Sequence, residues 1–218
     1  MIESLNILFP EIFLSISILF LLLLGVFIKD SYNLITKLSL LALASTMFII
    51  LKEDNVLIKI FSDSFVRNSF TNFIKILIIV SSIFIINSSQ IYIKDQKIAK
   101  FEYPIIILLS ILGMFFMVSS NDIILFYLGL ELQSLSLYIL AAIDRDNIRS
   151  TESGIKYFIL SALSSGLLLY GCSLLYGFTG STNFDVIAAE LNSENTGAIF
   201  AMVFVFGSDL FYDFRKCY

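Results

Sequence analysis

The sequence predicts an all-α, polytopic transmembrane helix bundle with six full membrane spans and an incomplete seventh. Of its 218 residues, 58% are hydrophobic and only 15% are charged, and the mean hydropathy is +0.91. A soluble globular chain has roughly 45–50% apolar and about 25% charged residues, so this chain has more apolar surface than one water-facing core can bury. Its long uncharged stretches lack the alternating pattern of a membrane β-barrel. Because backbone groups find no water in lipid, these stretches are predicted to be helices.

Six stretches are predicted to cross the membrane, whose hydrocarbon core is about 30 Å thick and takes roughly 20 residues of helix. They are Ile12 to Ile28, Leu38 to Leu51, Ile76 to Ile93, Tyr103 to Asn121, Ile123 to Ile143 and Ser153 to about Phe178. The second is short, and we expect Lys37 and Lys52 to reach the two interfaces from its ends. A seventh apolar stretch begins near Thr196 and becomes polar after Gly207, too soon for a full span.

The loops are too short for a soluble domain, and the longest are Glu53 to Thr71 and Thr179 to Asn195. The first has apolar residues at helical or strand-like spacing and is expected to lie along the membrane interface. Loops after the first, third and fifth spans carry seven Lys and Arg residues, against three on the opposite side. By the positive-inside rule, the N-terminus is predicted to lie outside the cytoplasm.

The composition makes several kinds of chemistry improbable for this chain. It has no His, and its two cysteines, Cys172 and Cys217, have neither CxxC nor zinc-site spacing. It has no GxGxxG or GxxxxGKS/T motif for a nucleotide, and no basic stripe for nucleic acid. We therefore expect no metal and no redox cofactor in this chain, so proton chemistry must use carboxylates, lysines, tyrosines or water.

Glu131 interrupts the fifth span near its middle, about 12 Å along the helix from Ile123 at 1.5 Å per residue. An ionised side chain at the bilayer centre costs about 2.5–3.5 kcal/mol on insertion scales, so it usually faces a protein interior or a hydrated path. Helical spacing places Tyr127, Ser134 and Tyr138 on the same face. We predict that Glu131 belongs to a proton path with these side chains in support. The alternatives are a packing hydrogen bond for the acid and ordinary aromatic packing for the tyrosines.

Lys156 lies near the start of the sixth span, one turn after Glu152. Its ammonium can snorkel to the surface or reach inward to a carboxylate, and the sequence leaves both open. If it meets Glu131, the two groups titrate as a coupled unit and complete the predicted proton path. Further along this span, two small-xxx-small pairs predict the close approach of a neighbouring helix: Ser161 with Ser165, and Ala162 with Gly166.

The remaining charges near the span ends are predicted to be structural. Lys75, at the start of the third span, is expected to be a snorkelling anchor at the interface. Glu11, Asp122 and Glu152 are expected to complement the dipoles of helix N-termini, and none is expected to lie deep in the membrane.

Residues 121–184 read NDIILFYLGLELQSLSLYILAAIDRDNIRSTESGIKYFILSALSSGLLLYGCSLLYGFTGSTNF. This run resembles subunit N of the bacterial proton-translocating NADH-quinone oxidoreductase, the antiporter-like complex I subunit that is homologous to mitochondrial subunit 2. Within it, YLGLELQSLSLYIL and ESGIKYFILSALSSGLLLYG look like the family's fifth and sixth helices, and FPEIFLSISILF near the N-terminus is similar to its first. The resemblance covers nearly everything up to about Phe206.

The resemblance implies a membrane subunit that couples electron transfer from NADH to quinone with proton translocation, with Glu131 and Lys156 on the proton path. It implies inverted helix repeats, and no redox cofactor in this chain, since NAD, flavin, iron–sulfur clusters and quinone belong to other subunits. It also implies a multi-pass protein of the bacterial inner membrane with a periplasmic N-terminus. The expected partners are the other membrane subunits and the lipid bilayer, and no nucleic acid.

The sequence departs from the family after Phe206, where Gly207 is followed by SDLFYDFRKCY. The resemblance therefore divides the chain into residues 1–206, the N-terminal part of the antiporter-like membrane domain, and 207–218, a divergent tail expected from a truncated or frameshifted gene. The lysine that the family pairs with the acid is missing, and so is the second repeat. A second polypeptide that supplies the missing half is left open. The alternative functions are a cation/proton antiporter subunit and a non-functional membrane fragment.

Overall fold

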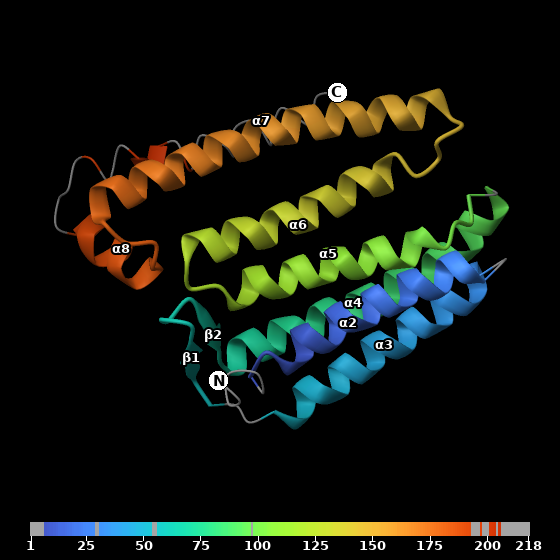
Figure 1. The fold of residues 1–218 in the computed structure, drawn as a ribbon, viewed down its shortest axis with the longest axis horizontal. Helices are drawn as coiled ribbons and strands as arrows, with labels where there is room; N and C mark the ends of the chain where they lie inside the picture. The colour runs from blue at the N-terminus through green and yellow to red at the C-terminus, as the bar shows by residue number, and fades with distance from the viewer. Residues whose placement is uncertain are drawn as a thin grey trace.

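The computed structural model describes residues 7–28, 31–53, 56–96, 98–192, 197, 201–203 and 205. Within them, six helices are long and apolar enough to cross a membrane: α2 (Phe9–Phe27), α3 (Tyr32–Lys52), α4 (Ser69–Asp95), α5 (Glu102–Ser119), α6 (Ile123–Ala141) and α7 (Ile148–Thr179). The predicted all-α multi-pass fold with six full spans is confirmed (Figure 1). The incomplete seventh span lies mostly outside the described residues, and the tail at 207–218 lies wholly outside them.

Most of the helices begin before the uncharged stretches do, and at α4 a side-chain cap marks the earlier start. Asn68 caps α4: its Oδ1 accepts from the backbone N of Thr71 at 2.8 Å, and Thr71 Oγ1 accepts from the backbone N of Asn68 at 2.9 Å. This reciprocal box starts α4 at Ser69, well before Ile76. Asp122 caps α6 in the same way, accepting from Ile124 N at 2.8 Å, so its predicted role at a helix N-terminus is confirmed.

The core of the bundle surrounds α5. This helix packs against α2, α3, α4 and α6, and it is the most buried of the six. The centre is filled by fully buried apolar side chains, among them Leu14, Ile79, Leu108, Ile111 and Phe115. Figure 1 shows α7 on the other side of α6, away from this core. Apolar residues on the outward faces are what a lipid solvent requires.

The helices α5 and α6 touch through their backbones at Gly113 and Gly129. A Cβ added at Gly113 would lie 2.7 Å from the backbone N of Gln133 and 2.8 Å from the carbonyl oxygen of Gly129. Both distances are too short for a carbon atom, so the interface needs glycine here. By contrast, nothing in the described structure lies within 4 Å of a Cβ added at Gly166, so the described helices make no close approach at the predicted Ala162–Gly166 pair. The Ser161–Ser165 pair does face a neighbouring helix, because Ser161 is buried and Ser165 lies beside Glu131 of α6.

One end of the bundle carries a short β-hairpin. The loop from Glu53 to Thr71, whose apolar spacing fitted either a helix or a strand, therefore contains strands. β1 (Ile58–Ile60) pairs antiparallel with β2 (Phe65–Arg67). The turn holds three consecutive non-glycine residues at positive φ, namely Phe61 at 54°, Ser62 at 54° and Asp63 at 66°. Such a turn is costly for L-residues and persists where other contacts hold it in place.

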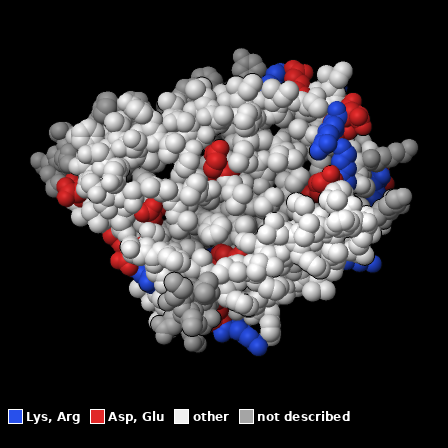
Figure 2. All heavy atoms as spheres, viewed as in Figure 1, with Lys and Arg blue, Asp and Glu red and all other residues white. Residues whose placement is uncertain are grey.

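Those contacts come from the α5–α6 turn and from α8 (Phe184–Asn192). Isolated bridges join Phe65 to Ser120 and Asp122 to Asn183, so three distant segments lie side by side at this end. We call the hairpin, the α5–α6 turn and the start of α8 the end layer. In Figure 1 the end layer lies at the left, opposite the α2–α3, α4–α5 and α6–α7 connections. Figure 2 shows a largely uncharged face, with Lys and Arg gathered near those connections.

Polar contacts tie the end layer together. Lys59 Nζ donates to Asp185 Oδ2 at 2.8 Å. Asn121 Nδ2 lies 3.2 Å from the same oxygen and 3.1 Å from the carbonyl oxygen of Asp63, donating to both. The hydrogen bond from Lys59, followed by that from Asn121, lowers the pKa of Asp185, and the contact with Asp185 raises the pKa of Lys59.

The glycine contact predicts different effects for the same substitution at two sites. Gly113→Ala should destabilise the protein by about 1–3 kcal/mol, because the new methyl group meets backbone that cannot move independently. Gly166→Ala should leave stability equal or raise it by up to about 1 kcal/mol, because the site is open and alanine favours helix. Denaturant unfolding of both variants in detergent tests this, and equal midpoints would contradict the backbone contact.

The Asp185 contact predicts that α8 loosens in acid. Because its pKa is lowered in the folded protein, the stabilisation is present above the ordinary aspartate pKa and is lost as pH falls through the lowered value. Hydrogen exchange of the α8 amides, corrected for the intrinsic pH effect, should therefore speed up over that range. Asp185→Asn should abolish the pH dependence, whereas Asp63→Asn should keep it. Exchange that is independent of pH in the unmodified chain would refute the contact.

Candidate functional site

Glu131 lies in α6 and faces α7. Its carboxylate and the phenol of Tyr127, one turn earlier on α6, both lie near the hydroxyl of Ser165 on α7, which donates to the backbone carbonyl oxygen of Ala162 at 3.2 Å. Glu131 Oε2 is buried and has no hydrogen-bond partner among the described residues. The carboxylate is therefore half-buried between two helices, with acceptor capacity free for water or another donor.

The other predicted members of this face have packing roles. Ser134 Oγ donates to the backbone carbonyl oxygen of Glu131 at 3.1 Å, so its hydroxyl is occupied within its own helix. Tyr138 is buried, and its ring meets Tyr157 edge-on at 4.8 Å and Phe158 at 5.8 Å, both on α7. The polar face thus points toward α7, with Tyr138 as an aromatic anchor beside the carboxylate site.

Lys156 is not brought to Glu131. Its Nζ lies 2.7 Å from Glu152 Oε1, one turn back on α7, and the two side chains are 72% and 57% exposed. Of the two outcomes that the sequence left open for Lys156, the side chain is therefore exposed on the protein surface and does not reach inward to Glu131. An exposed ion pair of this kind contributes little to stability. Across the described residues, no three His, Cys, Asp or Glu side chains gather closely enough to hold a metal ion.

Two serines of α7 take on polar roles that spacing alone did not assign. Ser165, predicted as a small packing residue, is the partner of Glu131 and Tyr127. Ser161, one turn earlier, is 4% exposed, and its hydroxyl has no hydrogen-bond partner in the described part of the chain. Their spacing of four residues was the available signal, since it places both hydroxyls on one face of the helix.

A second pair of charges is fully buried, and here the prediction for Lys75 was wrong. Lys75 Nζ lies 2.6 Å from Glu11 Oε1, and the two side chains are 2% and 1% exposed. The ammonium also lies 5.3 Å from the ring centre of Phe65 and 5.8 Å from that of Phe115. Lys75 is therefore not a snorkelling anchor. Glu11 lies in the first turn of α2, as predicted for an acid at a helix N-terminus, but its carboxylate is also paired with Lys75 inside the protein.

The error has a physical origin. When charged residues are used to delimit spans, Lys75 falls at an edge, although α4 begins nearly two turns earlier at Ser69. Glu11 and Lys75 are also 64 residues apart in the chain, and spacing within one helix cannot pair side chains from two. The available signal was the cap at Asn68 and Thr71, which marks the true helix start.

Comparison with known proteins supports the resemblance found in the sequence. Residues 120–211 match the family described as NADH:quinone oxidoreductase/Mrp antiporter, TM. NADH-quinone oxidoreductase subunit N of Pelagibacter ubique is 52% identical over 204 residues, which cover 93% of this chain and 43% of that protein. Subunit N of Parvibaculum lavamentivorans is 49% identical over 200 residues, which cover 90% of this chain and 41% of that protein.

Solved structures share the fold. A chain of respiratory complex I from Thermus thermophilus with bound aureothin superposes with a TM-score of 0.71 at 22% identity, covering 91% of this chain and 43% of that one. A chain of the membrane-bound sulfane sulfur reductase, an archaeal respiratory membrane complex, gives 0.76 at 20% identity, covering 92% and 43%.

The six long apolar helices define an all-α, multi-pass membrane fold, in which residues 120–211 match the antiporter-like family. The chain is similar over nearly its whole length to the N-terminal part of NADH-quinone oxidoreductase subunit N, and the resemblance stated for residues 121–184 is confirmed. The chain spans less than half the length of these curated relatives.

The buried pair predicts a non-additive stability effect. Lys75→Met should cost about 3–5 kcal/mol, because it leaves Glu11 as an uncompensated buried charge. Adding Glu11→Gln should recover most of this loss, because no unpaired charge then remains. The exposed pair is the control, and Lys156→Met should change unfolding little. Denaturant unfolding of the unmodified chain, Lys75→Met, Glu11→Gln and the double variant gives the coupling, and equal effects of Lys75→Met and Lys156→Met would contradict the burial of the first pair.

Proposed function

We propose that this chain is the part of a respiratory NADH-quinone oxidoreductase membrane subunit that carries a protonatable carboxylate, Glu131. Quinone chemistry elsewhere in the complex drives proton translocation through it. The observation that carries the proposal is the placement of Glu131, half-buried between α6 and α7 with one oxygen lacking a protein partner. This placement occurs in a chain 52% identical to a subunit N relative.

The geometry around Glu131 suits proton exchange. Hydroxyl groups both donate and accept, so Ser165 and Tyr127 can relay a proton to or from the carboxylate. Water at the free oxygen of Glu131 and at Ser161 would continue this chain of hydrogen bonds. Lys156 lies near the start of α7 at the protein surface, and we propose that it exchanges protons at the surface end of the path. We propose that Ser134 and Tyr138 support the path by packing beside Glu131.

We propose that this chain holds no redox cofactor and that NAD, flavin, iron–sulfur clusters and quinone belong to other subunits. The lack of a nucleotide-binding motif in the sequence supports this. Other membrane subunits are its partners, as expected from structural neighbours that are chains of multi-subunit membrane complexes. A second polypeptide is a further proposed partner.

We propose a bacterial inner-membrane location with the end layer toward the periplasm. The start of α2 lies at the same end of the bundle as the hairpin (Figure 1), so the N-terminus and the end layer share a side. The opposite connections hold the larger share of Lys and Arg in the sequence, which favours the cytoplasm for that side.

A cation/proton antiporter subunit is the second candidate. The matched family description includes the Mrp antiporter, and a chain of the Mrp complex from Dietzia sp. superposes with a TM-score of 0.64. Sodium-dependent proton exchange without NADH, measured in vesicles, would favour this candidate. A non-functional fragment is distinguished by looking for the polypeptide in the purified respiratory complex, where its presence indicates a working part.

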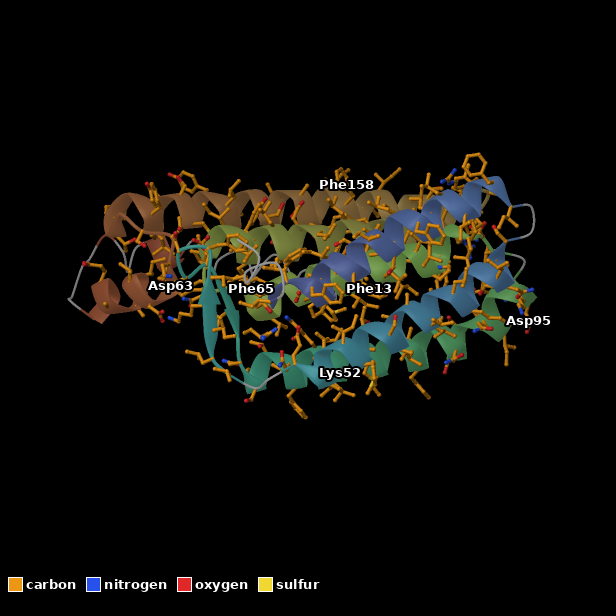
Figure 3. All side chains as sticks on the ribbon, turned by 60° about the horizontal axis from the view of Figure 1, so that its bottom comes forward. Phe13, Lys52, Asp63, Phe65, Asp95 and Phe158 are labelled. Atoms are coloured by element: carbon orange, nitrogen blue, oxygen red, sulfur yellow. The ribbon has the colours of Figure 1, made fainter. Side chains whose placement is uncertain are left out.

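The leading proposal is tested by Glu131→Gln in membranes that contain a complete subunit and its complex. A positioned acid–base group speeds proton transfer by roughly 10²–10⁴-fold, so quinone-linked proton pumping should fall by about tenfold or more where this path limits the rate. Asp95→Asn, at an exposed acid near the opposite end of the bundle (Figure 3), is the matched control and should leave pumping unchanged. Normal pumping by Glu131→Gln would exclude the role assigned to the carboxylate.

A further inference from the structure

Four charged side chains gather where the helices meet the end layer. Glu11 of α2 and Lys75 of α4 form the fully buried pair. Arg67, at the end of β2, places Nη1 2.9 Å from Oε1 of Glu53, which follows α3, and these side chains are only 9% and 12% exposed. The charges of Glu11 and Lys75 both act on Glu53, so the two pairs belong to one buried charge cluster. Its formal charge is zero, with two acids and two bases.

Polar atoms without a protein partner concentrate at this cluster. Among the described residues, Glu11 Oε2, Arg67 Nε and both amide atoms of Asn72 are buried without a hydrogen bond, as is the hydroxyl of Ser119. Asn72 is one turn before Lys75 on the buried face of α4, and it is 4% exposed. More than about 90% of buried polar groups are hydrogen-bonded. Five unbonded atoms in one place therefore indicate a bound ligand.

Ser119 belongs to the same place because of its neighbours. It lies one turn after Phe115, whose ring faces the Lys75 ammonium. The next residue, Ser120, bridges to Phe65, the second ring beside that ammonium. Ser119 is fully buried. Contacts from α5 and from β2 thus place its hydroxyl beside the buried charge cluster.

The chemistry of the unpartnered atoms fits water better than an ion. Glu11 Oε2 and Asn72 Oδ1 accept, Arg67 Nε and Asn72 Nδ2 donate, and a serine hydroxyl does both. Water, which donates two and accepts two hydrogen bonds, matches this mixture. A cation would be repelled by Lys75 and Arg67, and an anion by the two carboxylates.

The cluster is closed toward the bundle interior and open toward the end layer. On the interior side, Leu14, Ile79 and Ile111 are completely buried apolar side chains of the central core. On the end-layer side, Glu53 and Arg67 retain some exposure. Burial raises the pKa of the Glu53 carboxyl, opposed by the charge of Arg67, so this acid at the mouth can hold a proton more readily than a free glutamate.

We propose that this cluster is a buried water site open at the end layer, in which Glu11 and Lys75 exchange protons with water from that side. A hydronium ion gives its proton to Glu11 Oε2, leaving water and a neutral acid. Lys75, now without its anionic partner, releases a proton from Nζ to a second water, which passes it to Glu53. The reverse transfers restore the pair. The site is separate from Glu131, and the proposal does not depend on the role of that carboxylate.

The charged and titratable groups around the pair are defined within the described structure. Glu11 comes from α2, Glu53 from the end of α3, Lys75 from α4 and Arg67 from β2. The side chains that α5 places here, Ser119 and Phe115, carry no charge.

Solid-state NMR on the full chain in lipid bilayers, with ¹⁵N-labelled lysine side chains, tests the proposal. Magnetisation transferred from water should reach Lys75 Nζ within about a factor of two of the rate at the exposed Lys156, because bound waters contact both. The signal of Lys75 is assigned in a uniformly ¹³C,¹⁵N-labelled sample by correlating its side-chain nitrogen with its own backbone, so the assignment needs no variant. Transfer to Lys75 as slow as to the backbone amide of the buried Leu108 would show a dry site and overturn the proposal.

A second measurement on the unmodified chain tests proton exchange. After transfer of the bilayers to D₂O, the Lys75 Nζ protons should exchange as completely as those of Lys156. Protons that persist at Lys75 after the exposed lysines have exchanged would refute exchange with the end-layer side. Because this measurement needs no variant, it is decisive even if substitutions prevent folding.

The residues assigned to water are tested by the double variant Asn72→Leu/Ser119→Ala. It removes uncharged hydrogen-bonding groups and leaves all four charges, so water transfer to Lys75 should fall several-fold. Ser82→Ala is the matched control, because this buried α4 hydroxyl donates to the carbonyl oxygen of Ile78 at 2.7 Å. It should leave the transfer unchanged. Undiminished transfer in a folded double variant would contradict the assignment of water to these side chains.

Discussion

The structure depends on one constraint: a polar group placed in the hydrocarbon core of a membrane without a hydrogen-bond or charge partner costs free energy. Backbone groups meet this cost by forming helices, which accounts for six long spans. Side chains avoid the same free-energy cost by forming ion pairs and hydrogen bonds. Glu11 and Lys75, far apart in sequence, are brought to 2.6 Å, and the caps at Asn68 and Asp122 occupy helix N-termini. The charged residues outside these arrangements, such as Lys156, stay exposed.

Two polar sites result, and they differ in how their charge is compensated. Glu11 has a full counter-charge, so its burial is compatible with a stable ionised state. Glu131 has hydroxyl neighbours and a free oxygen, so its charge is less strongly held and responds more readily to water or a moving helix. The tight α5–α6 contact at Gly113 and Gly129 fixes the helix that carries Glu131 to the core of the bundle.

The end layer contacts the elements that carry both polar sites, the buried charge cluster and Glu131. Ser120 and Asp122 in the α5–α6 turn bridge to the hairpin and to the start of α8, so the same short turn borders the buried charge cluster and begins α6. The strained turn at 61–63 persists because Asn121 and Asp185 hold it from two other segments. The hairpin is therefore in direct contact with the turn that begins the helix carrying Glu131.

The sequence by itself determined the number of spans, the class of fold and the place of Asp122 at a helix N-terminus, because these follow from apolar length, composition and local sequence. The sequence left open whether Lys156 turns to the surface or toward a carboxylate, and whether the loop from Glu53 to Thr71 has helical or strand-like structure. Tertiary structure alone decided that Lys75 meets Glu11, that Ser165 meets Glu131 and that α5 touches α6 at two glycines. The reason is physical: spacing within one helix specifies which residues share a face, whereas the packing of separate helices decides which faces meet.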